Sequence, residues 1–258
     1  MAKTALITGA SGGIGEEFAK VFAREKYNLV LVARSEDKLI KLANELQSKY
    51  GVAVQVIAKD LAKPTAPQEL FDDLKNTQID ALINNAGYAT YGEFVTIDLQ
   101  TELNEMQLNM VTLTHLTKLV LPAMIENGFG QILNVASTAA FQPGPLMAVY
   151  YATKAYVLSF SEAIAKELEG TGVTVSALCP GPTKSGFQQR ADMTDSRLVQ
   201  NGLMTAQAVA ERGYKGLVKG ERVVIPGFSN KIGALAIRFS PRNMVTNLVM
   251  NMQKRVEH

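Results

Sequence analysis

Short apolar runs alternate with longer amphipathic segments along most of this chain, and this alternation limits its fold more than any other feature. The runs are nearly continuous in Val, Ile, Leu and Ala, as in strands that are covered on both faces of a parallel sheet. Strand–helix alternation with right-handed crossovers predicts an α/β fold, a doubly wound parallel sheet of about seven strands with helices on both faces. The expected strands are residues 3–8, 28–33, 52–58, 80–85, 130–137, 173–179 and 221–226, and the main expected helices are 14–26, 36–50, 101–127, 150–169 and 205–219.

The domain organisation follows from length and composition. A chain of 258 residues fits one domain, and no repeat or linker interrupts it before about residue 226. We therefore expect residues 1–227 to form the main domain and 228–258 to extend it. This C-terminal segment is basic and apolar, which predicts an amphipathic extension that caps the subunit. The alternative is a surface for an acidic, lipophilic partner: an acyl thioester carrier, an acidic lipid or an anionic membrane.

Composition also limits the classes of function and site. A formal net charge of +2 argues against a protein whose main task is binding nucleic acid. A single cysteine, Cys179, forms no internal disulfide and indicates a reducing compartment. Two histidines and one cysteine provide no cluster of metal ligands, so no metal site is expected. The first apolar run is too short for a signal peptide, and no stretch has the roughly 18 uncharged apolar residues of a membrane helix. We expect a soluble, cytoplasmic protein without an integral membrane segment.

The first expected strand runs directly into the sequence TGASGGIG, and a helix follows at once. Gly9, Gly13 and Gly15 permit close approach of the backbone to a phosphate at the positive end of that helix. Their spacing, G-x-x-x-G-x-G, departs from the commonest dinucleotide pattern, G-x-G-x-x-G. Taken alone, the loop could equally be a tight packing turn.

Five further motifs accompany the glycine loop in a fixed order along the chain. They are NNAG (84–87), LNMV (108–111), NVAS (134–137), YYATK (150–154) and CPGP (179–182). With these motifs the chain resembles the short-chain dehydrogenase/reductase family over about residues 3 to 226. The resemblance implies a Rossmann fold, a nicotinamide cofactor and a homodimer or homotetramer formed through the helices at 101–127 and 150–169.

The segment AVYYATKAYV contains three tyrosines and one lysine, and only one tyrosine is expected to be the acid catalyst. The family has a tyrosine followed four positions later by a lysine, which here gives Tyr150 and Lys154. Residues i and i+4 share one face of a helix, so this pair can face the substrate together. Tyr151 remains a weak rival at i+3 from the lysine. We expect Tyr151 and Tyr156 to serve packing or a subunit interface.

The chemistry explains the presence of a lysine. A free phenol has a pKa of about 10, and a nearby cation lowers it by about 1–3 units. We expect Lys154 to be the main cause of that depression, with the positive nicotinamide ring supplying the remainder. The resemblance further implies that Lys154 holds the ribose hydroxyls, that Ser137 binds the substrate oxygen and that Asn109 supports a proton-carrying water chain. Tyr150 would then give or take the proton while a hydride joins or leaves the nicotinamide.

The residues after the second strand predict the choice of cofactor. An acid at this position would bind the ribose hydroxyls of NAD, but Ala33 stands there and Arg34 follows. A guanidinium can clamp a 2′-phosphate, so NADP(H) is favoured. Ser35 either adds a hydroxyl bond or caps the next helix. Many NADP-dependent relatives carry a second basic residue in the glycine loop, where this chain has Gly12. The other contacts implied by the resemblance are Ser11, Ile14, Asp60, Leu61, Asn85, Ala86, Gly87, Pro180, Gly181, Thr183 and Ser185.

Three functions remain open at this point. The first is an NADPH-dependent reductase acting on a ketone or a 3-oxoacyl compound, and the second is an alcohol or hydroxysteroid dehydrogenase of the same fold. The third, a regulatory protein that binds NADP without turnover, is disfavoured because the serine, tyrosine, lysine and asparagine are all present. Residues 186–202 are polar with weak periodicity, and we interpret them as a mobile lid over the substrate.

Overall fold

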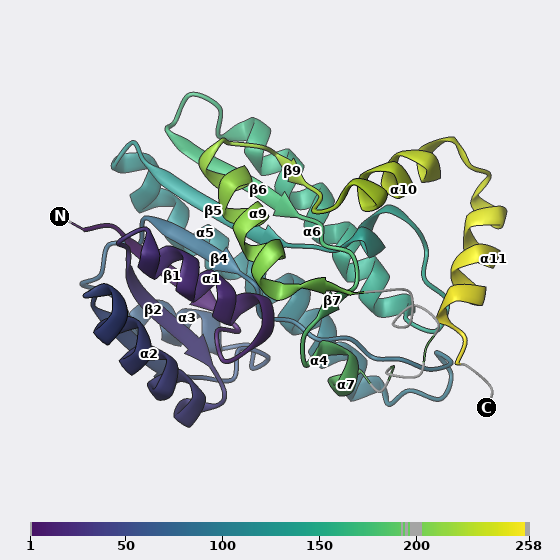
Figure 1. The fold of residues 1–258 in the computed structure, drawn as a ribbon, viewed down its shortest axis with the longest axis horizontal. Helices are drawn as coiled ribbons and strands as arrows, with labels where there is room; N and C mark the ends of the chain where they lie inside the picture. Colours follow the sequence, from purple (N-terminus) through teal and green to yellow (C-terminus); the bar gives the residue numbers. More distant parts are fainter. Residues whose placement is uncertain (1, 192, 194–195, 197–202, 256–258) are drawn as a thin grey trace.

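The computed structural model describes residues 2–191, 193, 196 and 203–255, and one sheet of seven strands forms its centre (Figure 1). The spatial order is β3-β2-β1-β4-β5-β6-β9, and every pair of neighbours is parallel. This confirms the predicted doubly wound α/β fold. The strands are β1 (Thr4–Thr8), β2 (Asn28–Ala33), β3 (Val54–Ala58), β4 (Ala81–Asn84), β5 (Gly130–Val135), β6 (Val173–Leu178) and β9 (Val223–Val224).

Helices cover both faces of the sheet, and each face has its own hydrophobic core. Successive side chains of a strand point to opposite faces, so Leu6 belongs to one core and Ile7 to the other. The helices on the Ile7 face are α1 (Gly13–Arg24), α2 (Glu36–Tyr50) and α9 (Ala206–Val218). Those on the Leu6 face are α3 (Ala66–Asp73), α5 (Leu113–Glu126) and α6 (Ala148–Glu167).

The long helix predicted for residues 101–127 is interrupted by a π-helical segment. α4 (Leu99–Met106) passes into η1 (Gln107–Thr112), and η1 passes into α5. Such π segments are rare and often lie at functional sites. Leu99–Glu126 is long and apolar enough to cross a membrane, but the core helices of soluble proteins meet the same criteria of length and composition.

Several elements differ from the sequence-based expectation. The helix α3 was not among those expected, and β9 is shorter than the strand predicted at 221–226. The C-terminal segment forms two helices, α10 (Phe228–Phe239) and α11 (Arg242–Gln253), with Pro241 between them. Its assignment to the main domain stays a prediction.

The expected lid at 186–202 is described only in part. It contains a short helix, α7 (Phe187–Arg190), whereas residues 192, 194–195 and 197–202 lie outside the described residues. On either side of it, β7 (Thr183–Lys184) pairs with β8 (Met204–Thr205) in a small second sheet.

The strand order places a crevice at one edge of the sheet. The direction of winding reverses at β1, which lies between β2 and β4. In open α/β sheets a ligand binds beyond the carboxyl ends of the strands at such a reversal. The motifs that follow β1, β4, β5 and β6 all lie at this edge.

Candidate active site

The turn after β1 is tight, and glycine is required at several of its positions. Gly9 and Gly13 have φ values of +67° and +59°, a region that favours glycine. A Cβ on Gly15 would lie 2.3 Å from the carbonyl oxygen of Gly9. The Nδ2 atom of Asn85, just after β4, donates to the carbonyl oxygen of Thr8 at 2.9 Å. The end of β4 is therefore tied to the turn that leads into α1.

The N-terminus of α1 suits an anion. Its N-cap residue, Gly12, provides no side-chain hydrogen bond to the first amides of the helix. The space beside it is open, because a Cβ on Gly12 would meet no atom within 4 Å. Free amides at the positive end of a helix bind phosphate groups, so the turn fits the pyrophosphate of a dinucleotide. Ser11 and Ile14 lie in this turn, and Ile14 reaches the cavity described below.

A pair of arginines lies at the edge of the sheet beyond β2. Arg34 is exposed, and Arg190 belongs to α7. Burial and the nearby charge of Arg34 together lower the pKa of Arg190. Neither guanidinium has a salt bridge within the described part of the chain, unlike those of Arg24, Arg212 and Arg222. Two unpaired guanidinium groups close together suit a phosphate.

The neighbouring predicted cofactor residues make local contacts. Ser35 is the N-cap residue of α2, but its side chain makes no capping hydrogen bond. Asp60 accepts a hydrogen bond from the amide of Ala62 at 3.1 Å. The carbonyl oxygen of Leu61 accepts one from Thr112 Oγ1 of η1 at 2.7 Å. The loop after β3 is thus fixed to the π segment, and contact with adenine stays a prediction.

Tyr150 and Lys154 lie near each other on α6, with exposed fractions of only 9% and 6%. The Nζ atom of Lys154 donates to the carbonyl oxygen of Val135 at 2.7 Å and lies 5.6 Å from the centre of the Tyr150 ring. Burial lowers the pKa of Lys154 to about 8, although the charge of Glu105 opposes this shift. The lysine can therefore exchange a proton near neutral pH.

The pKa of Tyr150 differs from the expectation drawn from the sequence. Burial raises it, and a hydrogen bond with Ser137 opposes the rise. Lys154 does not produce the expected depression, because its own ammonium group is destabilised by burial and binds Val135 rather than the phenol oxygen. Ser137 follows β5 and also accepts a bond from the amide of Ala139 at 3.1 Å.

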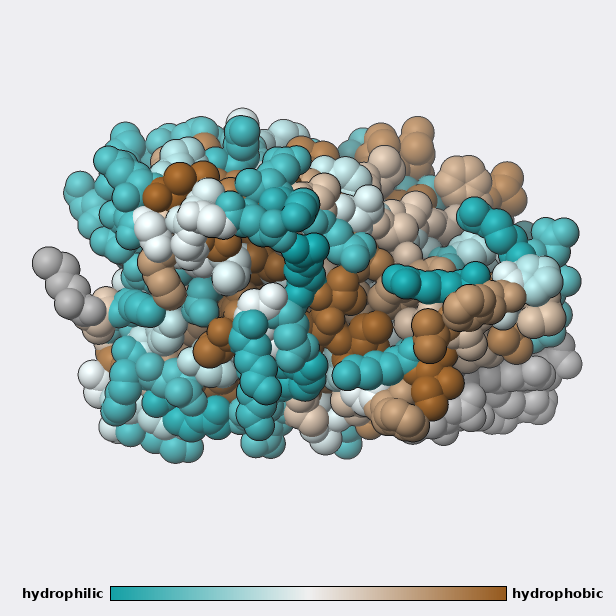
Figure 2. All heavy atoms as spheres, turned by 90° about the horizontal axis from the view of Figure 1, so that it is seen from above, coloured by the Kyte–Doolittle hydropathy of each residue, from teal (hydrophilic) through white to brown (hydrophobic). Residues whose placement is uncertain are grey.

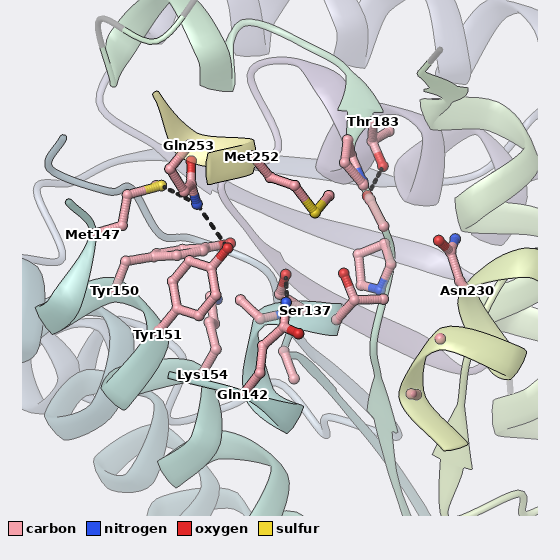
Figure 3. Close-up of a pocket in the computed structure, with 18 of the residues that line it drawn as sticks. Ser137, Gln142, Met147, Tyr150, Tyr151, Lys154, Thr183, Asn230, Met252 and Gln253 are labelled. Atoms are coloured by element: carbon pink, nitrogen blue, oxygen red, sulfur yellow. Dashed lines mark hydrogen bonds between the residues drawn. The ribbon is translucent and has the colours of Figure 1, made fainter. Parts of the chain in front are cut away.

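The hydroxyl of Tyr151 is engaged elsewhere. It accepts a hydrogen bond from Gln253 Nε2 at 2.7 Å, which ties the end of α11 to α6 (Figure 3). Its ring packs against Gly144, where a Cβ would lie 2.2 Å from the ring. Tyr156 points elsewhere, with its hydroxyl 2.9 Å from Thr114 Oγ1. Tyr151 therefore packs within the subunit, whereas Tyr156 is exposed and its place at a subunit interface stays a prediction.

Asn109 of η1 faces the segment after β4. Its Nδ2 atom donates to the carbonyl oxygen of Tyr88 at 2.9 Å and to Thr153 Oγ1 of α6 at 3.2 Å. Gly87 leaves no room for a side chain on the Asn109 side: a Cβ there would lie 2.8 Å from Asn109 Oδ1 and 3.7 Å from Lys154 Nζ. The π segment thus places Asn109 against Thr153 and Gly87, next to the Tyr150–Lys154 pair on α6. Ala86, just before Gly87, donates its amide to Thr8 Oγ1 at 3.0 Å.

The segment after β6 approaches the glycine turn. Thr183 Oγ1 donates to the carbonyl oxygen of Gly181 at 2.9 Å, and Ser185 Cβ lies 3.0 Å from the position of a Cβ on Gly13. Gln188 Nε2 in α7 donates to the carbonyl oxygen of Thr183 at 2.7 Å. Thr183 and Ser185 line the same cavity as Ser137 and Tyr150, as do Pro180 and Gly181.

A cavity of about 450 Å³ connects these residues with the C-terminal helices (Figure 3). Within the described residues, Lys154 is the one charged side chain in its lining. The wall contributed by the C-terminal segment was not predicted as part of the site, although the apolar residues of this segment recur at helical spacing. Apolar side chains that form the walls include Met147, Met193, Ile237, Met244, Leu248 and Met252.

Comparisons with known proteins agree with this geometry. The family model for the short chain dehydrogenases matches residues 3–196. The ketoacyl reductase HetN of Nostoc sp. is 33% identical over 83% of this chain and 75% of its own length. The very-long-chain 3-oxoacyl-CoA reductase-B of Danio rerio is 33% identical over 70% of this chain, and the match spans 59% of that protein. A short-chain dehydrogenase from Sphingobium yanoikuyae, solved in complex with NADPH, is 35% identical with a TM-score of 0.83, over 91% of this chain and 92% of that one.

Proposed function

The chain belongs to the short-chain dehydrogenase family of oxidoreductases, and from this premise we propose that it is an NADPH-dependent reductase of bulky, apolar carbonyl compounds. The substrate class is a ketone or a 3-oxoacyl compound. The observation that carries the proposal is the position of Ser137 and Tyr150 beside a cavity whose far wall is apolar. The names of the ketoacyl and 3-oxoacyl-CoA reductases among the relatives support the same class.

Each side chain has a definite task in the proposed reaction. Bound NADPH supplies the hydride. Tyr150 donates the proton to the carbonyl oxygen, and burial raises its pKa, so the phenol stays protonated at neutral pH. Ser137 donates a hydrogen bond to the same oxygen. Lys154, with a pKa lowered to about 8, returns a proton to the tyrosine after each reduction.

The cofactor would be held along the carboxyl edge of the sheet. The glycine turn and the N-terminus of α1 would bind its pyrophosphate. Arg34, helped by Ser35, would bind the 2′-phosphate, and Arg190 would take the place of the basic residue that many relatives carry in the glycine loop. Asp60 and Leu61 would contact the adenine, and Asn85 to Gly87 with Pro180 to Ser185 would surround the nicotinamide side.

The arginine pair gives a test of cofactor choice. We expect the wild type to use NADPH with a higher kcat/KM than NADH. Arg34→Ala removes a charge-assisted bond of about 1.5–3 kcal/mol, so KM for NADPH should rise about 10- to 100-fold while KM for NADH stays within about twofold. Arg190→Ala should also raise KM for NADPH more than KM for NADH. Steady-state kinetics with both cofactors measure this, and an equal loss with NADH would mean that the arginine does not read the 2′-phosphate.

The function itself is tested by NADPH oxidation over a panel of carbonyl compounds. The panel contains small ketones, bulky diaryl and alicyclic ketones, and 3-oxoacyl thioesters of increasing chain length. We expect kcat/KM to rise with the size of the apolar substituent, because the cavity wall is apolar and its lining offers no cation besides Lys154 among the described residues. Oxidation of secondary alcohols alone would favour the dehydrogenase direction. Saturable NADPH binding without any turnover would favour a regulatory protein.

Assembly and location belong to the same proposal. We expect a cytoplasmic homodimer or homotetramer. Support comes from the face of α4, η1 and α6, where Leu103, Val111 and Tyr156 are exposed. The outer surface over α10 and α11 also carries exposed apolar side chains, and long hydrophilic side chains lie between them (Figure 2).

A further inference from the structure

Two side chains, one helical turn apart on the α4–η1 helix, hold the segment that follows β4. Asn109 pairs with the backbone of Tyr88, donating to its oxygen at 2.9 Å and accepting from its amide at 3.3 Å. Glu105 pairs with Thr90: its Oε2 atom accepts from the amide at 2.8 Å and from Oγ1 at 2.9 Å. Residues 88–90 are therefore fixed to this helix at two neighbouring points.

The carboxyl group of Glu105 is wholly buried, and one of its oxygens is unpaired. Its exposed fraction is 0%, and Oε1 has no hydrogen-bond partner among the described residues. Burial raises the pKa of Glu105 to about 7, although the bonds from Thr90 and the charge of Lys154 oppose the rise. This carboxyl therefore changes its charge near neutral pH, unlike an exposed glutamate.

The negative charge of the same carboxyl affects the pKa values of Tyr150 and Lys154, the proposed catalytic pair. Gly87 directly precedes the segment that Glu105 and Asn109 hold, and a Cβ added to it would lie 3.7 Å from Lys154 Nζ. Burial raises the pKa of Tyr150 and lowers that of Lys154, and the negative charge of Glu105 raises both. The other titratable groups around Glu105 are Glu102 on its own helix and Tyr88 on the segment.

We propose that Glu105 is a positioning residue of this site. Its carboxyl helps to hold the Tyr88–Thr90 segment, which follows Gly87, against the helix, and its negative charge helps Tyr150 and Lys154 to keep their protons. The proposal rests on the reductase function proposed above. Reduction requires a protonated tyrosine, so an ionised Glu105 extends activity toward alkaline pH.

The first test is the pH profile of Glu105→Gln. The amide oxygen still accepts both bonds from Thr90, and only the charge is lost. Removing a negative charge lowers the pKa of the Tyr150–Lys154 pair, so the alkaline limb of kcat/KM for ketone reduction should shift to lower pH by about 0.5–1 unit. The melting temperature and the affinity for NADPH should match those of the wild type, which separates this effect from a folding defect.

Glu102→Gln is the matched control. Glu102 is also buried on α4, but its charge contributes to neither Tyr150 nor Lys154, so the alkaline limb should stay in place. An unchanged limb in Glu105→Gln as well would overturn the proposal and leave Glu105 a purely structural residue.

A second measurement does not depend on turnover. The wild type is labelled with carbon-13 at its glutamate carboxyls and titrated by NMR, and the Glu105 signal is assigned by its loss in Glu105→Gln. We expect this signal to titrate near neutral pH and to move to higher pH in Lys154→Met, which removes the opposing cation. Titration near the ordinary glutamate pKa of about 4.3 would refute the proposal. If no carbonyl compound is reduced, the proposed function fails, and the titration alone decides the role of Glu105.

Discussion

Replacing Tyr150 by phenylalanine is expected to lower kcat for carbonyl reduction by about 10²–10⁴-fold, the usual contribution of a general acid. The ring still fills its place between Tyr151 and Phe187, so the fold should not change. Binding of NADPH should remain within about twofold, measured by the change in NADPH fluorescence. The chain contains no tryptophan, so protein fluorescence interferes little.

Tyr151→Phe is the matched control for that variant. It removes the hydrogen bond from Gln253, which is worth about 1 kcal/mol, so the melting temperature should fall by about 2–4 °C. Its kcat should stay within a few-fold of the wild type. Loss of turnover in Tyr151→Phe with activity retained in Tyr150→Phe would reverse the assignment of the acid.

The second large effect, a loss of both stability and NADPH affinity, is expected for a substitution in the glycine turn. In Gly15→Ala the added Cβ would meet the carbonyl oxygen of Gly9 at 2.3 Å, and the backbone would have to move. Overpacking of this kind costs about 1–3 kcal/mol, so the melting temperature of the free protein should fall by about 2–12 °C. NADPH affinity should fall with it, because the displaced turn carries the amides for the pyrophosphate. Thermal denaturation and NADPH titration measure the two effects.

Gly12→Ala separates stability from cofactor binding. Gly12 has an extended φ of 171°, which any residue adopts, and a Cβ there meets no protein atom within 4 Å. The melting temperature should therefore change by little. Affinity for NADPH should still fall, because the methyl group would occupy the space beside the free amides. A stable Gly12→Ala variant with unchanged NADPH affinity would place the phosphates elsewhere.

The fold was predictable because its strands carry a strong local signal. Uninterrupted runs such as NLVLVA match β2 residue for residue, since a strand covered on both faces tolerates few polar side chains. The helix 36–50 also agrees with α2 at both ends. The helix α3 was harder to recognise, because it is only 8 residues long and begins beside a proline. The π segment at Asn109 was not predicted, because it spans only six residues within a longer helix, too few for its wider turn to be told from α-helix in the apolar pattern.

From the residues alone, the site was predictable only where residues near in sequence meet, whereas Asn109, Ser137 and Thr183 were assigned through the family resemblance. The spacing of Tyr150 and Lys154 placed them together on α6, and the glycines indicated a tight turn. Contacts between distant segments gave no such signal. Gln253 meets Tyr151 across 102 positions of sequence, and Arg190 approaches Arg34 from a segment that was expected only to be a lid. The buried state of Lys154, which decides its pKa, also depends on the whole fold.

Because α10 and α11 form the far wall of the cavity, the residues of the proposed reaction and the residues that would contact the rest of the substrate lie in different parts of the sequence. Tyr150, the proposed proton donor, and Lys154 lie in the first two thirds of the sequence, whereas Ile237, Met244, Leu248 and Met252 shape the far wall of the cavity. The last thirty or so residues thus form one wall of the cavity, far in sequence from the proposed reaction centre. Substitutions of these four side chains are therefore expected to change which substrates fit the cavity, while the residues that would move the proton stay untouched.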